Sequence, residues 1–495
     1  METPRLSKSR VQSGAQCVLR LWNERNAPEL ATPPGEAQQY LFDRGREIGE
    51  LARERYPGGS LIAADHRQTD LALSQTAEKL SQSPLPILFE PAFLHRNVLV
   101  RVDVLRPVGA EGFDLIEVKS ATKAKEVYLR DVAIQYWILR GAGAPLREAG
   151  LLLLDRSYTF DGRRLDLDRL FVFTDLSTQI GELQEEVETL VDELQSLLRR
   201  HEPPEIQPGP QCVDPYECPF LAHCSADLTP AEHPVSELPR LRKERQLELR
   251  EMGVDEIAEI PDAFSLNPLQ QRVRRCVREQ RDWIGSGLGD ALGSIRHPVH
   301  HLDFEAFMPA IPLYEGTHPF DALPFQYSIH RESESGDLEH LEYLCRDRSD
   351  PRRPLAEQLL ADLGSEGSIC VYAPYEKGII TALAKTFPDL QGPLEALLRR
   401  IWDLLPVIRG NYYHPDFHGS FYIKTVLPVL VPELSYEGLE ISDGMAAARQ
   451  YEATLETADE DARRDVFESL LQYCGLDTEA MVRLRAALAK KVGDP

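Results

Sequence analysis

The chain has 495 residues with an apolar fraction of 42%, which is too long for one hydrophobic core and predicts two or three globular domains. Its formal net charge of -25 argues against a protein that coats nucleic acid through bulk attraction, so a polyanionic substrate must meet a local basic groove. The chain contains no apolar run of about 18 residues and no apolar signal-peptide core near residue 1, so we expect a cytoplasmic protein without a membrane partner.

The stretch 98–120, VLVRVDVLRPVGAEGFDLIEVKS, contains two extended runs joined by a glycine-containing turn at 107–112. Successive strand residues point to opposite faces, so Asp103 lies opposite a row of valines, and Glu117 and Lys119 share one face. The turn brings Glu117 and Lys119 opposite Asp103, where two carboxylates and an ammonium converge. An exposed hairpin with a solvated outer face is the ordinary alternative for such a pattern.

The first region extends to about residue 227 and alternates strands with helices. Its expected elements are a helix near 124–140, strands at 149–155 and 169–176, and a helix at 178–200 with apolar residues at three- and four-residue spacing. A proline-rich loop at 201–211 follows and leads into a group of cysteines.

Three cysteines after this loop, Cys212, Cys218 and Cys224, have five residues between each pair and lie among proline and tyrosine residues. In a reducing compartment such a group is more typical of a metal site than of disulfides. Three thiolates need a fourth ligand, and Cys17 lies in an otherwise polar N-terminal stretch. Zinc, the main rival, usually takes closer C-x2-C pairs, so the spacing favours an iron–sulfur cluster.

A linker module is expected over about 228–295. Gly253 between two helical patterns suggests a small helical hairpin, a shape that can contact a phosphate backbone. The most basic patch of the chain lies in its second half and consists of Arg272, Arg274, Arg275, Arg278 and Arg281. A solvated basic face is the ordinary alternative to contact with nucleic acid.

The third region, about 296–495, opens with strands at 299–314, 324–330 and 340–345 that precede helices, which predicts a mixed sheet covered by helices. Asp303 and Glu305 are separated by one residue and lie on one face of the first strand. Such a pair suits the beginning of a two-metal carboxylate site.

A helix at 470–484 carries Tyr473 and Asp477 four residues apart, on one face. There the tyrosine can orient an attacking water while the carboxylate holds a metal. One further acid is needed, and Asp403 is our choice because an acid in an apolar setting needs a reason. The alternatives for this acid are Glu376, Asp416 and Asp443. For an isolated Tyr-x-x-x-Asp, a buried helix face without chemistry is the more common case.

Residues 5–226 resemble the RecB-like branch of the PD-(D/E)XK nucleases, specifically members with an iron–sulfur cluster such as the CRISPR adaptation nucleases and the AddB-type repair nuclease. The resemblance implies a structural [4Fe–4S] cluster held by Cys17, Cys212, Cys218 and Cys224. It implies that Asp103 and Glu117, with the Val118 carbonyl, bind Mg²⁺ or Mn²⁺ and that Lys119 orients water or stabilises charge. Gln135 corresponds to the glutamine of the family's following helix.

Two positions depart from the RecB-like pattern. Leu139 stands where the family has a tyrosine, and the early-helix motif 45-GREIG-49 lacks the family's histidine. That histidine often completes the metal shell, so Glu47 and Glu50 are the candidates to replace it.

Residues 298–490 resemble the DnaQ-like, RNase H-fold exonucleases of the DEDDy kind. In this resemblance Asp303, Glu305, Asp403 and Asp477 hold two metal ions about 4 Å apart, and Tyr473 is the motif tyrosine. The chain as a whole resembles a bacterial family that joins the two nuclease modules.

We therefore expect an α/β fold with α+β elements, in which a small helical module joins a restriction-endonuclease-like PD-(D/E)XK domain to an RNase H-like exonuclease domain. The expected function is metal-dependent hydrolysis of phosphodiester bonds in DNA, in repair, recombination or defence. No helicase P-loop occurs, so unwinding would need a helicase partner. The alternatives are a nucleic-acid-binding scaffold with an inactive first site and an RNA-processing nuclease.

Overall fold

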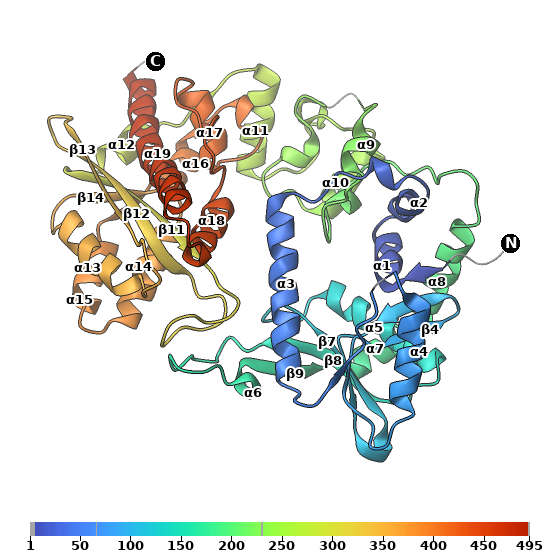
Figure 1. Cartoon of the computed structure of the whole chain (residues 1–495). Helices are drawn as coiled ribbons and strands as arrows, with labels where there is room; N and C mark the ends of the chain where they lie inside the picture. The colour runs from blue at the N-terminus through green and yellow to red at the C-terminus, as the bar shows by residue number, and fades with distance from the viewer. Residues whose placement is uncertain (1–4, 66, 229–230, 494–495) are drawn as a thin grey trace. The chain divides into compact units, whose positions relative to one another are not determined.

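The computed structural model describes residues 5–65, 67–228 and 231–493 and divides into two units (Figure 1). Unit 1 comprises Met1–Leu228 and Pro309–Asp321, and unit 2 comprises Thr229–Met308 and Ala322–Pro495. Each unit combines helices with a sheet of parallel and antiparallel strands, which confirms the mixed α/β class. None of the helices in the described ranges is both long and apolar enough to cross a membrane.

A six-stranded sheet with the order β2-β3-β6-β7-β8-β9 is the centre of unit 1. Its strands are β2 Ser60–Leu61, β3 Leu88–Phe89, β6 Val104–Pro107, β7 Phe113–Val118, β8 Leu146–Leu154 and β9 Phe171–Asp175. A three-stranded sheet with the order β1-β5-β4 is formed by β1 Leu6–Ser7, β4 Ala92–His95 and β5 Val98–Arg101. The expected extended run at 98–107 is therefore two strands, and the chain changes sheet at Val102 and Asp103.

Helices cover both faces of the six-stranded sheet. They include α1 Lys8–Gln16, α2 Val18–Asn26, α3 Glu36–Glu54, α4 Thr69–Leu80, α5 Glu126–Gly141, α6 Leu167–Leu170, α7 Ser177–Glu182, α8 Gln184–Leu197 and α9 Leu221–Ser225. Leu115 and Leu151 share a core with α5 and α8, whereas Ile116 and Leu152 share one with α3. The helix expected at 178–200 is thus two helices, α7 and α8, which meet at Leu183.

The segment Pro309–Asp321 packs in unit 1 although it follows the first long strand of unit 2. Ala310 is buried in the core beneath α3, and Phe160 exchanges backbone hydrogen bonds with Gly316 and Thr317, at 2.8 and 3.0 Å. The strand expected at 299–314 therefore ends at Phe307. The residues from Pro309 to Asp321 belong to unit 1 instead of extending this strand.

A five-stranded sheet with the order β13-β12-β11-β14-β15 is the centre of unit 2. Its strands are β11 Val299–Phe307, β12 Leu323–Glu332, β13 Leu338–Leu344, β14 Ser368–Val371 and β15 Ile401–Asp403. β12 is antiparallel to β11 and β13, and β14 is parallel to β11 and β15. A separate two-stranded antiparallel sheet is formed by β10 Trp283–Ile284 and β16 Tyr412–Tyr413.

Alternate residues of β11 face opposite helical layers. Leu302 and Phe304 pack against α13 Arg352–Leu363, α14 Tyr375–Thr386 and α15 Gln391–Leu398. The other face packs against α18 Gly444–Glu456 and α19 Glu460–Gly493, and Figure 1 shows α19 running along the sheet. Asp303 and Glu305 are on the face that α19 covers.

The module expected over 228–295 shares the core of unit 2. Its helices are α10 Lys243–Glu251, α11 Pro268–Glu279 and α12 Leu288–Gly293. Leu249 and Val273 lie in one buried cluster with residues of α16 Leu404–Asn411, α17 Ile423–Leu430 and α19. This module therefore packs as part of the second unit.

Candidate active sites

The register of β6 and β7 places Asp103 opposite Glu117. Val104 pairs with Ile116 in this antiparallel ladder, so Asp103, just before Val104, faces Glu117, just after Ile116. Asp103 Oδ2 accepts a 2.7 Å hydrogen bond from the Val118 N–H, which fixes the carboxylate at the end of the ladder. The convergence predicted from strand alternation is thus present.

Two lysines and a third acid surround Glu117. Lys119 Nζ donates to Glu117 Oε1 at 2.5 Å and to Asp131 Oδ2 at 2.7 Å. Lys8 Nζ lies 3.1 Å from the same Glu117 oxygen and 2.9 Å from Asp131 Oδ1. Gln135 donates to Glu117 Oε2 at 2.7 Å. Lys8 and Asp131 were missed in the sequence, although Asp131 stands one helical turn before Gln135.

The charges in this cluster divide unevenly between the two central carboxyls. Burial would raise the pKa of Glu117, but Lys8 and Lys119 hold it well below its usual range. Burial and the Glu117 charge raise the pKa of Asp103 to about 8. Gln135 Oε1 is buried without a hydrogen-bond partner. Two carboxylates and an unpaired amide oxygen form a donor set that fits a hard divalent cation.

The early helix α3 carries the two glutamates that the sequence predicts as further candidate ligands. Glu47 and Glu50 on α3 are both exposed, and Glu50 lies 3.9 Å from Arg53. Glu90, which directly follows β3, lies beside the cluster, because its N–H donates to the Asp103 carbonyl at 3.3 Å, and burial raises the pKa of its carboxyl. Glu90 was not singled out in the sequence.

The four predicted cluster cysteines come together in unit 1. Burial raises the pKa of the Cys218 thiol, and Cys212 and Cys17 act in the same direction. Burial also raises the pKa of the Cys224 thiol, with the same three cysteines adding to the shift. Gln16 Nε2 ties the segments together by donating to the carbonyls of Gln211 and Tyr216 at 2.7 and 2.6 Å.

The four thiols can be compared with the ligands of a single tetrahedral ion. Four sulfurs around one tetrahedral ion at 2.3 Å would lie about 3.8 Å apart. Among the described residues, the cysteines do not form a group of three or more whose ligand atoms all lie within 4.8 Å of one another. The four thiols are the sulfur donors that could hold a metal group in unit 1.

Three acids of unit 2 form a compact cluster. Oxygens of Asp303 and Glu305 on β11 and of Asp477 on α19 all lie within 4.8 Å of one another. Burial and Asp477 raise the pKa of Asp303 well above its ordinary value, and burial and Asp303 do the same for Glu305. Burial raises the pKa of Asp477 to about 6. Buried carboxyls that repel one another in this way need a cation or protons.

The fourth acid of the cluster is Glu376, one of the alternatives considered for Asp403. Glu376 lies at the start of α14, 2% exposed, and its carboxyl is hydrogen-bonded to that of Asp303. Glu376 Oε2 has no hydrogen-bond partner. Asp403 Oδ1 instead caps α16 by accepting from the Leu405 and Ala373 N–H groups, both at 3.0 Å. Asp403 thus has a structural reason for its apolar setting.

Two tyrosines and a lysine flank Asp477. The Tyr436 hydroxyl donates to Asp477 Oδ1 at 2.6 Å, and the hydroxyl of Tyr473, 3% exposed, lies within hydrogen-bonding reach of the same carboxyl. Lys424 Nζ donates to the Tyr473 hydroxyl at 2.9 Å and to the Ser442 carbonyl at 2.5 Å. Of the other two alternative acids, Asp443 caps α18 through the Ala446 N–H, and Asp416 lies in the 3-10 helix η6 Pro415–Phe417 with its carboxyl 3.6 Å from His414 Nδ1. Tyr436 and Lys424 were missed because no local pattern connects them to α19.

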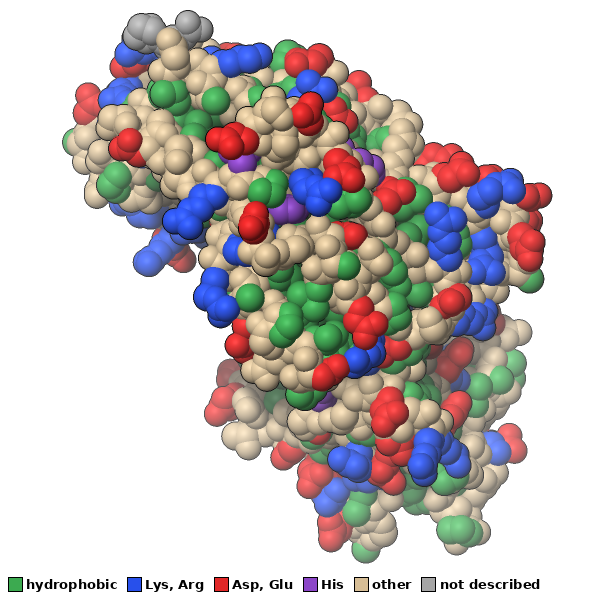
Figure 2. Space-filling model, turned by 90° about the vertical axis from the view of Figure 1, so that its left-hand side faces the viewer, with side chains coloured by type: hydrophobic (Ala, Val, Ile, Leu, Met, Phe, Trp, Pro, Cys, Tyr) green, Lys and Arg blue, Asp and Glu red, His purple; other side chains and the backbone are tan. Residues whose placement is uncertain are grey.

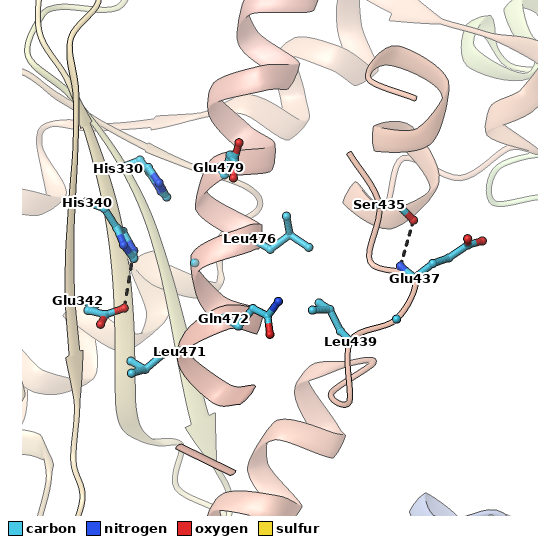
Figure 3. Close-up of a pocket in the computed structure, with 12 residues that line it drawn as sticks. His330, His340, Glu342, Ser435, Glu437, Leu439, Leu471, Gln472, Leu476 and Glu479 are labelled. Carbon is cyan, nitrogen blue, oxygen red and sulfur yellow. Dashed lines mark hydrogen bonds and ion pairs between the residues drawn. The ribbon is translucent and has the colours of Figure 1, made fainter. Parts of the chain in front are cut away.

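A cavity of about 530 Å³ also lies in unit 2 (Figure 3). Figure 3 shows it between the β12 and β13 strands, α19 and the loop that carries Ser435 and Glu437. His330 and His340 stack at 4.5 Å on the strand side, and burial together with His340 lowers the pKa of His330 to about 4. On α19 the cavity is lined by residues such as Gln472 and Glu479, whereas the acid cluster uses Asp477.

The arginines of α11 are largely engaged within unit 2. Arg272 stacks on Trp283 at 3.6 Å and donates to the Arg409 carbonyl at 2.8 Å. Arg278 donates to backbone carbonyls and to Asp262. On the face shown in Figure 2, Lys and Arg side chains are interspersed with Asp and Glu. These contacts give Arg272 and Arg278 a role in packing, whereas Arg275 and Arg281 are exposed.

Comparison with known proteins matches part of unit 2. Residues 300–422 match a protein family described as a domain of unknown function (DUF2779). This range contains Asp303, Glu305 and Glu376, whereas Tyr473 and Asp477 lie beyond its end. A comparison with curated proteins found no match. A solved structure titled "Crystal structure of SSO0001" is 13% identical, and the alignment covers 46% of this chain and 89% of that chain with a TM-score of 0.22. A likeness at this TM-score carries no argument about fold or function.

Proposed function

We propose that the chain is a metal-dependent nuclease that hydrolyses phosphodiester bonds of DNA and has one active site in each unit. The observation that carries the proposal is the buried acid cluster of Asp303, Glu305 and Asp477, joined by Glu376 with its unpaired oxygen. Apolar residues would pack at these positions without electrostatic repulsion, so the carboxyls are best explained by bound cations.

The sheet of unit 2 supports an RNase H-like assignment. Numbered along the chain, its strands have the order 3-2-1-4-5, and the second strand is the one reversed relative to the others. This is the arrangement expected of the RNase H-like fold, with the first two acids on the central first strand. The side chains as well as the topology therefore favour a DEDDy exonuclease, since fold alone would not indicate activity.

In unit 2, Asp303, Glu305, Asp477 and Glu376 would hold two Mg²⁺ or Mn²⁺ ions, which prefer oxygen ligands. Such ions supply an activated water and neutralise charge on the scissile phosphate. The Tyr473 hydroxyl lies near Asp477 and Lys424, in a position to orient the attacking water.

In unit 1, Asp103 and Glu117 would hold the ion of a RecB-like PD-(D/E)XK site. The Val118 N–H orients Asp103, and the unpaired oxygen of Gln135 provides a further acceptor beside Glu117. Lys119 would stabilise negative charge on the phosphate, because its ammonium already lies at the carboxylates.

One observation favours a second candidate function for unit 1. The Lys8 ammonium bridges Glu117 and Asp131, where it competes with a metal ion for the same oxygens. If Lys8 remains there when substrate binds, unit 1 binds nucleic acid without cutting it, and the chain has a single active site.

The four cysteines of unit 1 would hold a [4Fe–4S] cluster of structural role. The cluster would join α1 to a segment 195 residues later, which restricts the unfolded chain strongly.

We expect anaerobically purified protein to be brown with about four iron atoms per chain. Replacing Cys218 by Ser should unfold unit 1 and spare unit 2, as measured by limited proteolysis, because cluster binding is also folding energy. Zinc without iron in the anaerobic preparation would contradict this assignment.

Digestion of end-labelled single- and double-stranded DNA and RNA, with Mn²⁺ or with EDTA, tests the nuclease proposal. We expect DNA to be shortened with Mn²⁺ and to stay intact with EDTA. Intact DNA in all Mn²⁺ reactions would contradict the proposal, and cleavage of RNA alone would identify an RNA-processing nuclease. Efficient digestion of long duplexes would need a helicase partner.

A further inference from the structure

Two histidines and a glutamate form a third group of potential ligands, apart from both acid clusters. Ligand atoms of His233, Glu237 and His418 all lie within 4.8 Å of one another, and all three residues belong to unit 2. His418 Nδ1 lies 3.1 Å from Glu237 Oε2, and His233 Nδ1 lies 3.8 Å from the same oxygen. The two imidazole rings are tilted against each other with centroids 5.0 Å apart.

The burial of His233 distinguishes this group from an ordinary surface ion pair. His233 is 4% exposed, and its Nδ1 atom has no hydrogen-bond partner. A His418–Glu237 pair alone would leave this nitrogen desolvated without compensation, which proteins generally avoid. The nitrogen lies 3.8 Å from Glu237 Oε2, so a cation bound between these two atoms would satisfy it.

The backbone around the group is fixed in place on both sides. Glu256 accepts hydrogen bonds from the Glu232 and His233 N–H groups at 2.8 and 3.0 Å. Glu237 ends a short 3-10 helix, η4 Val235–Glu237, and its carbonyl lies where a side chain at Gly419 would clash, since a Cβ there would be 1.6 Å from the oxygen. Gly419 also has φ +70, which favours glycine. This close approach holds Glu237 against the loop of His418.

The geometry suits a tetrahedral ion. Ligand atoms at about 2.0–2.1 Å from such an ion lie about 3.3 Å apart, and the two distances to Glu237 Oε2, 3.1 and 3.8 Å, bracket that value. Imidazole nitrogens favour zinc-class cations, whereas Mg²⁺ and Mn²⁺ favour the all-oxygen acid clusters. His418 is half exposed, which leaves the fourth position to water.

We propose that His233, Glu237 and His418 bind a zinc-class divalent cation. The ion joins the start of unit 2 to a loop 181 residues later and so clasps the module of α10 and α11 to the region around α17. The inference is independent of the proposed nuclease activity. It concerns ligands that lie outside both acid clusters and outside the cysteine group.

Co²⁺ titration of the full-length protein, followed by visible absorption, tests this site without any assay of activity. We expect Co²⁺ to give the wild type d–d absorption bands and Zn²⁺ to abolish them. In His418→Ala and Glu237→Gln, the part of these bands that comes from nitrogen and oxygen ligands, without sulfur-to-cobalt charge transfer, should be lost. His297→Ala is the matched control, because His297 is an exposed histidine of the same unit outside the group. It should retain the bands in full.

Thermal unfolding provides the second readout. Zn²⁺ should raise the Tm of the wild type and of His297→Ala and leave that of His418→Ala unchanged, because a ligand stabilises the state that binds it. His418 is half exposed, so its replacement should not itself unfold the chain. Equal Co²⁺ bands and equal Zn²⁺-induced Tm shifts in wild type and His418→Ala would overturn the proposal. The absence of both effects from the wild type would overturn it as well.

Discussion

The two acid clusters differ in how their negative charge is balanced. In unit 1, Lys8 and Lys119 both contact Glu117, and its pKa stays well below the usual range. In unit 2, burial and neighbouring carboxyls raise the pKa values of Asp303 and Glu305. Two lysines contact the carboxylate of Glu117 directly, whereas in unit 2 Lys424 offsets the raised pKa values of Asp303 and Glu305 only in part, so that cluster depends on protons or on cations from solution.

This difference predicts that a metal ion has a different effect in each unit. In unit 1 the ion must compete with ammonium groups for carboxylate oxygens. In unit 2 it relieves repulsion among buried carboxyls, so binding of metal and stability of the fold are strongly coupled. Variants that remove one charge at a time test whether the two clusters differ in this way.

The largest expected effect is the loss of a carboxylate in unit 2. Asp477→Asn should lower the Mn²⁺-dependent exonuclease rate by more than about 10³-fold, because a single transition-state hydrogen bond already contributes about 10²–10³-fold. Asp403→Asn is the isosteric control and should keep its rate, since asparagine also caps helices well. Equal rates for the two variants would remove Asp477 from the active site.

In unit 1 the two lysines should respond in opposite ways. In the Asp477→Asn background, Lys119→Met should lower residual DNA cleavage by about 10²-fold, as for lost charge stabilisation. Lys8→Met should tighten Mn²⁺ binding, because it removes an ammonium that competes for Glu117 and Asp131. Calorimetric Mn²⁺ titration and cleavage rates measure both effects. Unchanged Mn²⁺ affinity in Lys8→Met would show that Lys8 does not compete with the ion.

The tyrosines beside Asp477 should separate catalysis from metal binding. Tyr473→Phe should lower the exonuclease rate by about 10²-fold with little change in Mn²⁺ affinity, if its hydroxyl positions water. Tyr436→Phe should weaken Mn²⁺ binding by about 10-fold, because its hydroxyl donates to Asp477 and such supporting contacts tune metal ligands. Full exonuclease activity in Tyr473→Phe would assign that tyrosine to packing alone.

The smallest expected effect is on stability and has an unusual sign. The pKa of Glu305 in the folded chain is raised above its ordinary value of 4.5. The folded state therefore retains a proton that the unfolded state releases, so this group lowers the free energy of unfolding as the pH rises above 4.5.

Glu305→Gln should remove this pH-dependent fall in the free energy of unfolding. In EDTA at about pH 8, we expect the free energy of unfolding of unit 2 to rise by about 1–3 kcal/mol, the usual cost of a poorly compensated buried polar group. Urea unfolding measures the change, and the gain should shrink at lower pH. With Mn²⁺ the order should reverse, because the wild type gains the bound ion. A variant that is less stable than the wild type in EDTA would refute the repulsion argument.

Local sequence periodicity was sufficient to identify most of the acids in the two clusters. Asp103 and Glu117 follow from strand alternation, Asp303 and Glu305 from their spacing of two, and Asp477 from its place on a helix. These relations are set within a few residues, and the structure places each of them as expected. The mixed α/β class followed in the same way from the order of strands and helices.

Residues brought in by distant pairing were not predictable from such patterns. Lys8 reaches Glu117 across 109 residues because β1 pairs with β5, and no short-range pattern specifies that pairing. Asp403 was chosen for its apolar neighbours, but an aspartate directly before a helix is also an N-cap signal. That signal would have favoured Glu376, whose carboxyl is buried beside Asp303.

The most direct test of two active sites is digestion of end-labelled single- and double-stranded DNA by the wild type, Lys119→Ala, Asp303→Ala and the double variant, each with Mn²⁺. The account predicts that each single variant loses a different part of the product pattern and that the double variant leaves the DNA intact. Digestion by the double variant at the wild-type rate would contradict the assignment of catalysis to these two clusters.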